Sequence, residues 1–242
     1  MFDIKKTIKS FLFRQVYPHR STSEELTEYI RSGGGKIGVN TFFFDPAHTV
    51  IDEKRLSYLK IGANCCITKN VQFLNHDYSW SVLRKSHNDF LPDPGRYIEI
   101  GDNVFIGWNS IIIGDVKVGD NVIIGANSVV TRDLPSNSVC AGSPARVICS
   151  LDDYYKKKEQ ERVTAAIKRI KHIENVMKRV PTSDDMGWFA VLYLKRTKEN
   201  CDFLRKLPFH GDDKELVLRN FMSTNPLFES FEELLKKARS IE

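Results

Sequence analysis

Hydrophobic and polar positions repeat every six residues through the middle of the chain. From Ile100 to Pro135 the sequence divides into IGDNVF, IGWNSI, IIGDVK, VGDNVI, IGANSV and VTRDLP, with Ile or Val always first and Asn or Asp always fourth. A period of six fits neither an α-helix at 3.6 residues per turn nor a two-sided strand at 2.0. It predicts a parallel β-helix, whose short strands point one β-branched residue inward and end at corners where Gly, Asn or Asp adopts left-handed backbone.

The same six-residue frame occurs nearer the N-terminus, with one long interruption. It opens with IGVNTF at Ile37, loses its regularity, and returns as IGANCC, ITKNVQ and FLNHDY between Ile61 and Tyr78. Residues 79–97 do not repeat, and the frame resumes at Ile100. We therefore expect a β-helix domain over residues 36–150, with a loop over 79–97 that leaves the coil at one corner.

Helical periods flank the repeats on both sides. Residues 1–35 predict a helical lead with an apolar side, and a second helix begins at Ser23 with an acidic first turn. Residues 151–242 predict a helical extension, with one helix ended by Pro181 and others over 188–204 and 214–240. The stripe that predicts the first of these helices consists of Val163, Ile167, Ile170, Ile173, Met177 and Val180. The predicted fold class is mainly β, a parallel β-helix with a helical lead and a helical extension.

Composition and charge are those of a soluble globular protein. The chain has 242 residues, is 41% hydrophobic and 28% charged, and carries a net charge of +5. Lys and Arg gather between Lys156 and Arg179, either as a solvated helix face or as a patch for phosphates or an anionic surface. The basic, amphipathic N-terminus either covers one end of the domain or contacts a membrane surface. The mild charge gives no reason to expect a nucleic-acid partner.

Cysteine usage indicates a reducing compartment. The five cysteines form an odd set without a CxxC motif, and the sequence shows no signal peptide or apolar run of membrane-spanning length. We expect reduced thiols and a cytoplasmic protein. Cys65 and Cys66 are the fifth and sixth residues of one repeat, so we expect one in the core and the other near the surface.

His76 is the residue that departs most clearly from the repeat. It occupies the fourth position of FLNHDY, where the other regular repeats have Asn or Asp, and it lies three residues before the loop. This predicts an imidazole on the outside of the coil beneath a flap, where a group with an ordinary pKa near ~6.5 can act as a general base. The alternative is that His76 only fills a corner. No pair of histidines has the spacing of metal ligands, so no metal site is expected.

The segment from Ile100 to Ile148 resembles the hexapeptide-repeat acyltransferases. The sequence NHDYSW at Asn75–Trp80, followed by a loop and IGDNVFIG, is similar to their sugar O-acetyltransferase branch, which includes galactoside and maltose acetyltransferases. The resemblance covers residues 36–148 and implies a left-handed β-helix, a homotrimer, and acetyl-CoA as the acyl donor in a groove between subunits. It implies that His76 takes the proton from an acceptor hydroxyl as that oxygen attacks the thioester.

The resemblance also assigns residues to the donor. The backbone N–H at Gly107-Trp108 would face the developing oxyanion, and Ala126, Thr131, Arg132 and Arg146 would contact the pantetheine and phosphates of the donor. The family pattern often has a second basic residue where this chain has Cys149. A carboxylate that orients His76 is expected, with Asp45 and Asp52 as candidates.

The segment around His76 would form the acceptor site. The residues expected there are Asn75, Asp77, Trp80, Arg84 and His87. Trp80 either stacks on a sugar ring or packs the flap against the coil. The function expected is O-acetylation of a sugar or sugar-containing acceptor by direct transfer. The alternatives are N-acylation of an amino sugar, metal-dependent hydration on the same kind of coil, and a β-helix that binds or scaffolds without catalysis.

Overall fold

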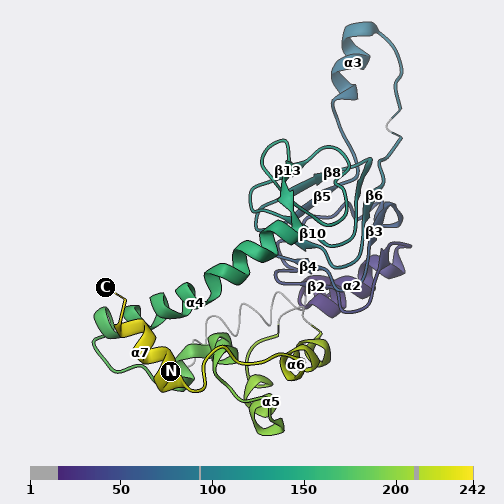
Figure 1. The fold of residues 1–242 in the computed structure, drawn as a ribbon. Coiled ribbons are helices and arrows are strands. Elements are labelled where there is room, and N and C mark those ends of the chain that lie inside the picture. Colours follow the sequence, from purple (N-terminus) through teal and green to yellow (C-terminus); the bar gives the residue numbers. More distant parts are fainter. Residues whose placement is uncertain (1–15, 93, 210–212, 242) are drawn as a thin grey trace. The chain divides into compact units, whose positions relative to one another are not determined.

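The chain divides into two compact units after Asp152 in a computed structural model that describes residues 16–92, 94–209 and 213–241 (Figure 1). The first unit contains the β-strands and the second is helical. The predicted first helix of the lead, with its suggested membrane contact, lies outside the described residues. None of the helices described is long and apolar enough to cross a membrane.

The first unit is a three-sided coil of short strands. Each side is a sheet of parallel strands, except that β13 runs antiparallel to β12 at the last coil. Sheet A contains β1 (Lys36–Ile37), β3 (Leu59–Ile61), β6 (Ile98–Ile100) and β9 (Val116–Val118). Sheet B contains β2 (Phe42–Phe43), β4 (Cys66–Ile67), β7 (Phe105–Ile106), β10 (Val122–Ile124), β12 (Ser138–Ala141) and β13 (Arg146–Ser150). Sheet C contains β5 (Gln72–Leu74), β8 (Ile111–Ile113) and β11 (Val129–Val130).

The register stacks the first residues of successive repeats above one another inside the coil. Ile61 pairs with Ile100 in sheet A, Ile67 with Ile106 in sheet B, and Phe73 with Ile112 in sheet C. All six side chains are at most 1% exposed. Full burial of one such side chain contributes about 1.5–3 kcal/mol, so these columns form the core. The predicted fold class, a parallel β-helix with flanking helices, is confirmed.

Asparagines at the fourth repeat position form the corners, as predicted. Asn64, Asn103, Asn109, Asn121 and Asn127 have φ between 54° and 64°, the left-handed region. Their side-chain amides bond between neighbouring coils, for example from Asn109 to Asn127 at 2.8 Å and from Asn103 to Asn121 at 2.8 Å. The corner residue therefore turns the chain and ties adjacent coils together.

The corners are named by the sheets that they join. Corner AB contains Asn64, Asn103 and Asn121, and corner BC contains Asn70, Asn109 and Asn127. Corner CA connects sheet C to sheet A. It differs from the others because its chain is longer in the first two coils, over residues 51–58 and 75–97.

Helix α2 (Ser23–Ser32) covers the open end of the first coil. It begins at Ser23 as predicted, and Thr22 caps it by accepting the backbone N–H of Glu25. Leu26 and Ile30 are fully buried in the same apolar cluster as the coil interior. The short 3₁₀ helices η1 (Pro18–Arg20) and η2 (Leu56–Tyr58) lie before α2 and within corner CA.

The interruption at 79–97 is not the plain loop that the sequence predicts. It contains a helix, α3 (Trp80–His87), which ends at Asn88 with φ of 50°. Figure 1 shows α3 extending away from the coils of the first unit. We call residues 78–97 the flap.

The helices of the second unit end at other residues than the sequence predicts. Helix α4 (Leu151–Asn175) buries Ile167, Ile170 and Ile173, but it stops before Met177 and Val180, which are exposed. Lys178 has φ of 55°, which no α-helix accommodates. The predicted extension of this helix to Pro181 is therefore wrong.

Each of the two later helices predicted is divided in two. The first becomes the 3₁₀ helix η3 (Ser183–Leu192) and α5 (Lys198–Leu204), and the second becomes α6 (Lys214–Ser223) and α7 (Phe231–Arg239). Thr197 caps α5 and Ser230 caps α7 through side-chain oxygens that accept backbone N–H groups. These capping residues start new helices where an apolar stripe alone predicts continuity.

Candidate active site

Corner CA brings residues from successive coils into one column. Val50 pairs with Gln72 in sheet C, so the chain that follows Val50 lies beside the chain that follows Leu74. This places Asp52 and His76 on adjacent coils at the same corner. Further along the stack, corner CA contains Asp115 and then Thr131 and Arg132.

His76 and Asp52 form a hydrogen-bonded pair. The distance from His76 Nδ1 to Asp52 Oδ2 is 2.8 Å, and the two side chains are 27% and 8% exposed. Asp52 also accepts the guanidinium of Arg55 at 2.9 Å and the backbone N–H of Lys54 at 3.1 Å. Of the two candidate carboxylates, Asp45 instead pairs with His48 at 2.9 Å.

The surroundings of Asp52 keep its carboxyl ionised. Burial acts to raise its pKa, but the hydrogen bonds from Arg55, His76 and Lys54 outweigh burial and hold the pKa below its ordinary value. An ionised carboxylate only accepts hydrogen bonds, so Nδ1 of a neutral His76 carries the proton. The lone pair of the ring is then on Nε2, which has no hydrogen-bond partner among the residues described. This is the arrangement that a general base requires.

Tyr78 is a residue at this site that the sequence reasoning missed. Its ring packs edge-on against the His76 ring with centroids 4.9 Å apart, and its side chain is 67% exposed. The run of aromatic and charged residues in NHDYSW was a signal, but a single tyrosine two residues from a histidine has no motif of its own. Tyr78 presents a polar hydroxyl and an aromatic face beside the imidazole.

Asn75 and Asp77 have structural contacts on either side of His76. Asn75 is 1% exposed, and its amide donates to the carbonyls of Tyr58 at 3.3 Å and Arg96 at 2.8 Å. Asp77 accepts the backbone N–H of Ser79 and pairs with Arg96 at 3.0 Å. These bonds close the base of the flap, and the Asn75 amide, which was expected to contact the acceptor, is buried and bonded within the fold.

The Arg84 side chain contacts three other residues of the flap. Its guanidinium lies 3.6 Å from the ring centroid of Trp80 and 4.6 Å from that of Phe90. Its Nε also donates to the carbonyl of Leu91 at 2.7 Å. Trp80 therefore packs on Arg84 within the flap, whereas from the sequence we expected it to stack on a sugar ring or to pack the flap against the coil. His87, at the end of α3, is exposed and bonds to Ser86.

The residues expected to bind the donor lie at two different corners. Gly107, Trp108 and Ala126 are at corner BC. Arg146 begins β13, which pairs with β12, and β12 in turn pairs with β10, the strand that precedes Ala126. Thr131 and Arg132 are at corner CA with His76. The two groups therefore lie at opposite ends of sheet C, at the two corners that flank it.

Gly107 is required by the stacking of the coils. Its own N–H donates to the carbonyl of Ile124 at 2.8 Å, and a Cβ added to it would lie 2.5 Å from the backbone nitrogen of Ala126. The N–H of Trp108, in contrast, has no partner among the residues described. The Trp108 side chain is 59% exposed and lies near the ammonium of Lys69. This N–H is therefore available to a ligand.

The adjacent cysteines behave as predicted. Cys65 is fully buried and Cys66 is half-buried. Burial raises the pKa of the Cys65 thiol to about 11, which makes it a poor nucleophile. Within the described residues, His, Cys, Asp and Glu form no group of three or more that would hold a metal ion.

Part of the coil is similar to a known family of repeats. Residues 97–132 match the family model described as bacterial transferase hexapeptide (six repeats). The chain is also 48% identical over 99 residues to Protein CapG of Staphylococcus aureus, which is 41% of this chain and 56% of that protein. The chain thus spans little more than half of this relative.

Solved acetyltransferase structures are similar to the hexapeptide segment and its surroundings. The maltose O-acetyltransferase from Clostridium difficile 630 is 28% identical, with 61% of this chain and 87% of that chain covered and a TM-score of 0.39. A hexapeptide-repeat-containing acetyltransferase from Vibrio cholerae is 29% identical, with 49% and 63% covered and a TM-score of 0.38.

Proposed function

We propose that the chain is an acetyl-CoA-dependent O-acetyltransferase that acts on a hydroxyl of a sugar or sugar-containing acceptor. The observation that carries the proposal is the His76–Asp52 pair at 2.8 Å on a transferase hexapeptide coil. The pair leaves Nε2 of His76 as a proton acceptor. Exposed Tyr78 beside it gives a sugar an aromatic surface and a hydroxyl to bind.

The reaction follows from the protonation state of the pair. Nε2 of His76 removes the acceptor's hydroxyl proton as the oxygen attacks the thioester carbonyl. The C–O bond forms, the C–S bond breaks, and the imidazolium returns its proton to the departing CoA sulfur. Asp52 holds the ring by Nδ1 and stabilises the imidazolium, since the carboxylate stays ionised.

Developing negative charge on the carbonyl oxygen requires a donor. The backbone N–H of Trp108 is our candidate because it is not used in the coil ladder among the described residues. One well-placed donor of this kind contributes roughly 3–4 kcal/mol to lowering the barrier. Arg132 and Arg146 are candidates for the phosphates of CoA, because both are guanidinium groups on the outside of the coil stack.

We propose a homotrimer in which neighbouring chains share each site. The two corners that hold the candidate residues flank sheet C in one chain, so corner BC of one chain would meet corner CA of the next. The outer faces of the sheets support this arrangement. Sheet A turns charged residues outward, including the Lys60–Glu99 pair, whereas sheets B and C turn mainly apolar residues outward. The latter are Phe42, Phe105, Ile123, Val139, Leu74, Ile111, Ile113 and Val129.

The activity is tested by release of CoA thiol from acetyl-CoA with a panel of sugar acceptors, offered as matched hydroxyl and amino pairs. We expect turnover with hydroxyl acceptors and a loss of roughly two to four orders of magnitude in His76→Ala. His48→Ala is the control, because His48 also pairs with a carboxylate, that of Asp45, but its side chain is exposed and is not part of the proposed site. Acylation of amino acceptors alone would favour N-acyl transfer, and failure to bind acetyl-CoA would favour a scaffold.

The shared site is tested by mixing two variants after co-refolding or co-expression. His76→Ala removes the base at corner CA, and Ala126→Trp fills the exposed surface at corner BC. If one site uses both corners of different chains, mixed assemblies regain part of the activity that neither variant has alone. Absence of any recovery, with mixed assemblies shown to form, would contradict the shared site.

A further inference from the structure

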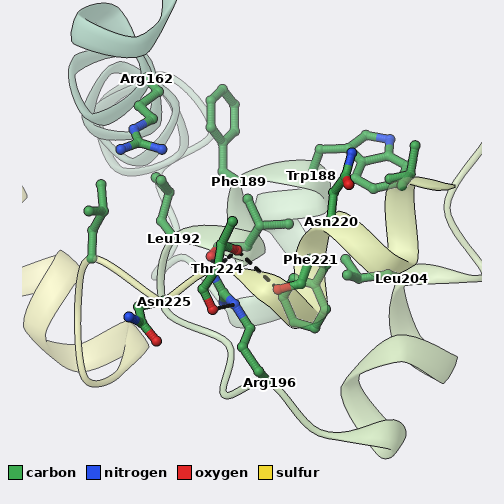
Figure 2. A pocket seen from close by; sticks show the side chains of 13 residues that line it. Arg162, Trp188, Phe189, Leu192, Arg196, Leu204, Asn220, Phe221, Thr224 and Asn225 are labelled. Carbon is green, nitrogen blue, oxygen red and sulfur yellow. Dashed lines mark hydrogen bonds between the residues drawn. The ribbon is translucent and has the colours of Figure 1, made fainter.

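The second unit contains a cavity of about 470 Å³, lined by η3, α4, α5, α6 and the segment before α7 (Figure 2). Its walls are largely apolar and include Trp188, Phe189, Leu192, Leu204, Phe221 and Leu227. Cavities of about 300–1,000 Å³ with apolar walls and few polar groups are typical of small-molecule sites in proteins. Every lining residue belongs to this unit, so the cavity does not depend on how the two units are arranged.

The polar groups at the cavity favour negative charge. They are two guanidinium groups, Arg162 and Arg196, the amides of Asn220 and Asn225, and the hydroxyl of Thr224. No Asp or Glu is among the residues that line the cavity within the described part of the chain. Figure 2 shows Arg162 on the α4 side and Arg196 beside Thr224.

Arg196 is a half-buried cation without a carboxylate partner in the described chain. Its guanidinium donates to the carbonyls of Val191 and Leu194, and to the carbonyl and hydroxyl of Thr224 at 3.2 Å each. The Cζ atom of Arg196 also lies over the ring of Phe221, 4.3 Å from the ring centroid. Burial lowers the pKa of this group. A desolvated charge that only neutral dipoles compensate gains from a nearby anion.

Arg162 supplies the accessible charge. Its side chain is 45% exposed, and its ion pair with Glu159 is long, at 3.6 Å between an exposed donor and an exposed acceptor. Such surface pairs contribute little and exchange readily. Arg162 is therefore free to bind the charged end of a ligand whose apolar part lies in the cavity.

We propose that this cavity binds an amphipathic anion, with an aromatic or aliphatic body between Trp188, Phe189 and Phe221 and one acidic group toward Arg162. This binding site is separate from the proposed acetyl transfer and does not depend on it. The ligand class follows from an apolar cavity of ligand size whose fixed charges are all positive.

Two fluorescent probes test the proposal on the full chain. Anilinonaphthalene sulfonate has an aromatic body and one sulfonate, and N-phenylnaphthylamine has the same body without the charge. We expect one sulfonate probe per chain, with the neutral probe bound about tenfold more weakly, because it cannot form the charge-assisted hydrogen bond to Arg162. Equal affinities, or several probes per chain, would overturn the proposal.

Three variants locate the site. Arg162→Gln should weaken the sulfonate probe about tenfold while leaving the neutral probe unchanged. Val217→Trp, which fills the cavity, should weaken both probes, whereas Leu216→Trp on the exposed side of the same helix should weaken neither. Melting temperatures of the variants show that each is folded.

Two further results would count against the site. If Val217→Trp is folded and binds the sulfonate probe like the wild type, the probe binds elsewhere. If a second copy of the chain covers the cavity, probe binding falls as protein concentration rises and Val217→Trp changes the sedimentation coefficient. Either result would exclude this small-molecule site.

Discussion

Asp52 and His76 are 24 positions apart in the sequence, yet the carboxylate of one accepts the ring N–H of the other. The coil brings them together because Val50 and Gln72, each shortly before one member of the pair, lie side by side in sheet C. Arg55 donates to the same carboxylate oxygen, Oδ2. The pair is therefore fixed from two coils, and it gives His76 one defined tautomer.

Replacing Asp52 by Asn should reduce turnover while His76 stays in place. The amide can donate to Nδ1, which favours the tautomer that has its proton on Nε2 and no lone pair there. We expect a loss of at least ~10²-fold in kcat, as for other histidines whose orienting carboxylate is removed. Asp45→Asn, which removes the partner of His48, should leave kcat unchanged. A wild-type rate in Asp52→Asn would mean that the carboxylate does not act through the imidazole.

Asp52 should also make stability depend on pH. Its pKa in the folded chain lies below the ordinary value, so its contribution is fully present above the unfolded-state pKa and is lost as pH falls through the folded-state pKa. We expect the difference in urea midpoint between the wild type and Asp52→Asn to be larger at pH 7 than at about pH 3. A difference that grows on acidification would have the wrong sign for this pair.

Gly107→Ala should destabilise the coil. The added Cβ would lie 2.5 Å from the nitrogen of Ala126 and 2.7 Å from the carbonyl carbon of Gly125, both backbone atoms of the next coil. Overpacking of this kind costs about 1–3 kcal/mol. Gly125→Ala is the matched control one coil further on, where the nearest atom is the Ala141 Cβ at 3.0 Å and the next lies at 3.6 Å. Urea unfolding should show a clearly larger loss for Gly107→Ala.

Arg84→Lys should loosen the flap without unfolding the β-helix. Lysine keeps the charge but loses the planar stacking between Trp80 and Phe90 and the directed bond to Leu91. We expect faster amide hydrogen exchange across residues 80–91 and unchanged exchange in the core strands. Lys85→Ala, next to it on α3, should change neither. Unchanged flap exchange in Arg84→Lys would show that Arg84 does not hold the flap together.

Arg132→Gln and Arg146→Gln should weaken CoA binding. Each removes one guanidinium at a corner proposed for the donor phosphates, and a charge-assisted bond contributes ~1.5–3 kcal/mol, which is about tenfold or more in Kd. Calorimetric titration with CoA measures the effect. Lys117→Gln, on the outer face of sheet A, should bind CoA like the wild type. If Arg132→Gln and Arg146→Gln bind CoA as tightly as the control Lys117→Gln, the donor site lies elsewhere.

The repeat pattern by itself determined the β-helix and most of its detail. A period of six residues predicted the inward positions of Ile61, Ile100 and Ile106 and the left-handed corners at Asn103 and Asn121. The reason is that each coil is made by local preferences, and identical coils stack only in register. The start of α2 at Ser23 could be read for the same reason, because a cap and an acidic first turn act locally.

The tertiary structure decided which residues meet. The choice of Asp52 over Asp45 depends on which segment of an irregular coil lies beside His76, and no short-range pattern carries that information. The contacts of Arg84 within the flap and the division of the later helices into shorter ones follow from packing and capping between separated residues. Local preference sets the coil, whereas the site depends on long-range contacts between coils.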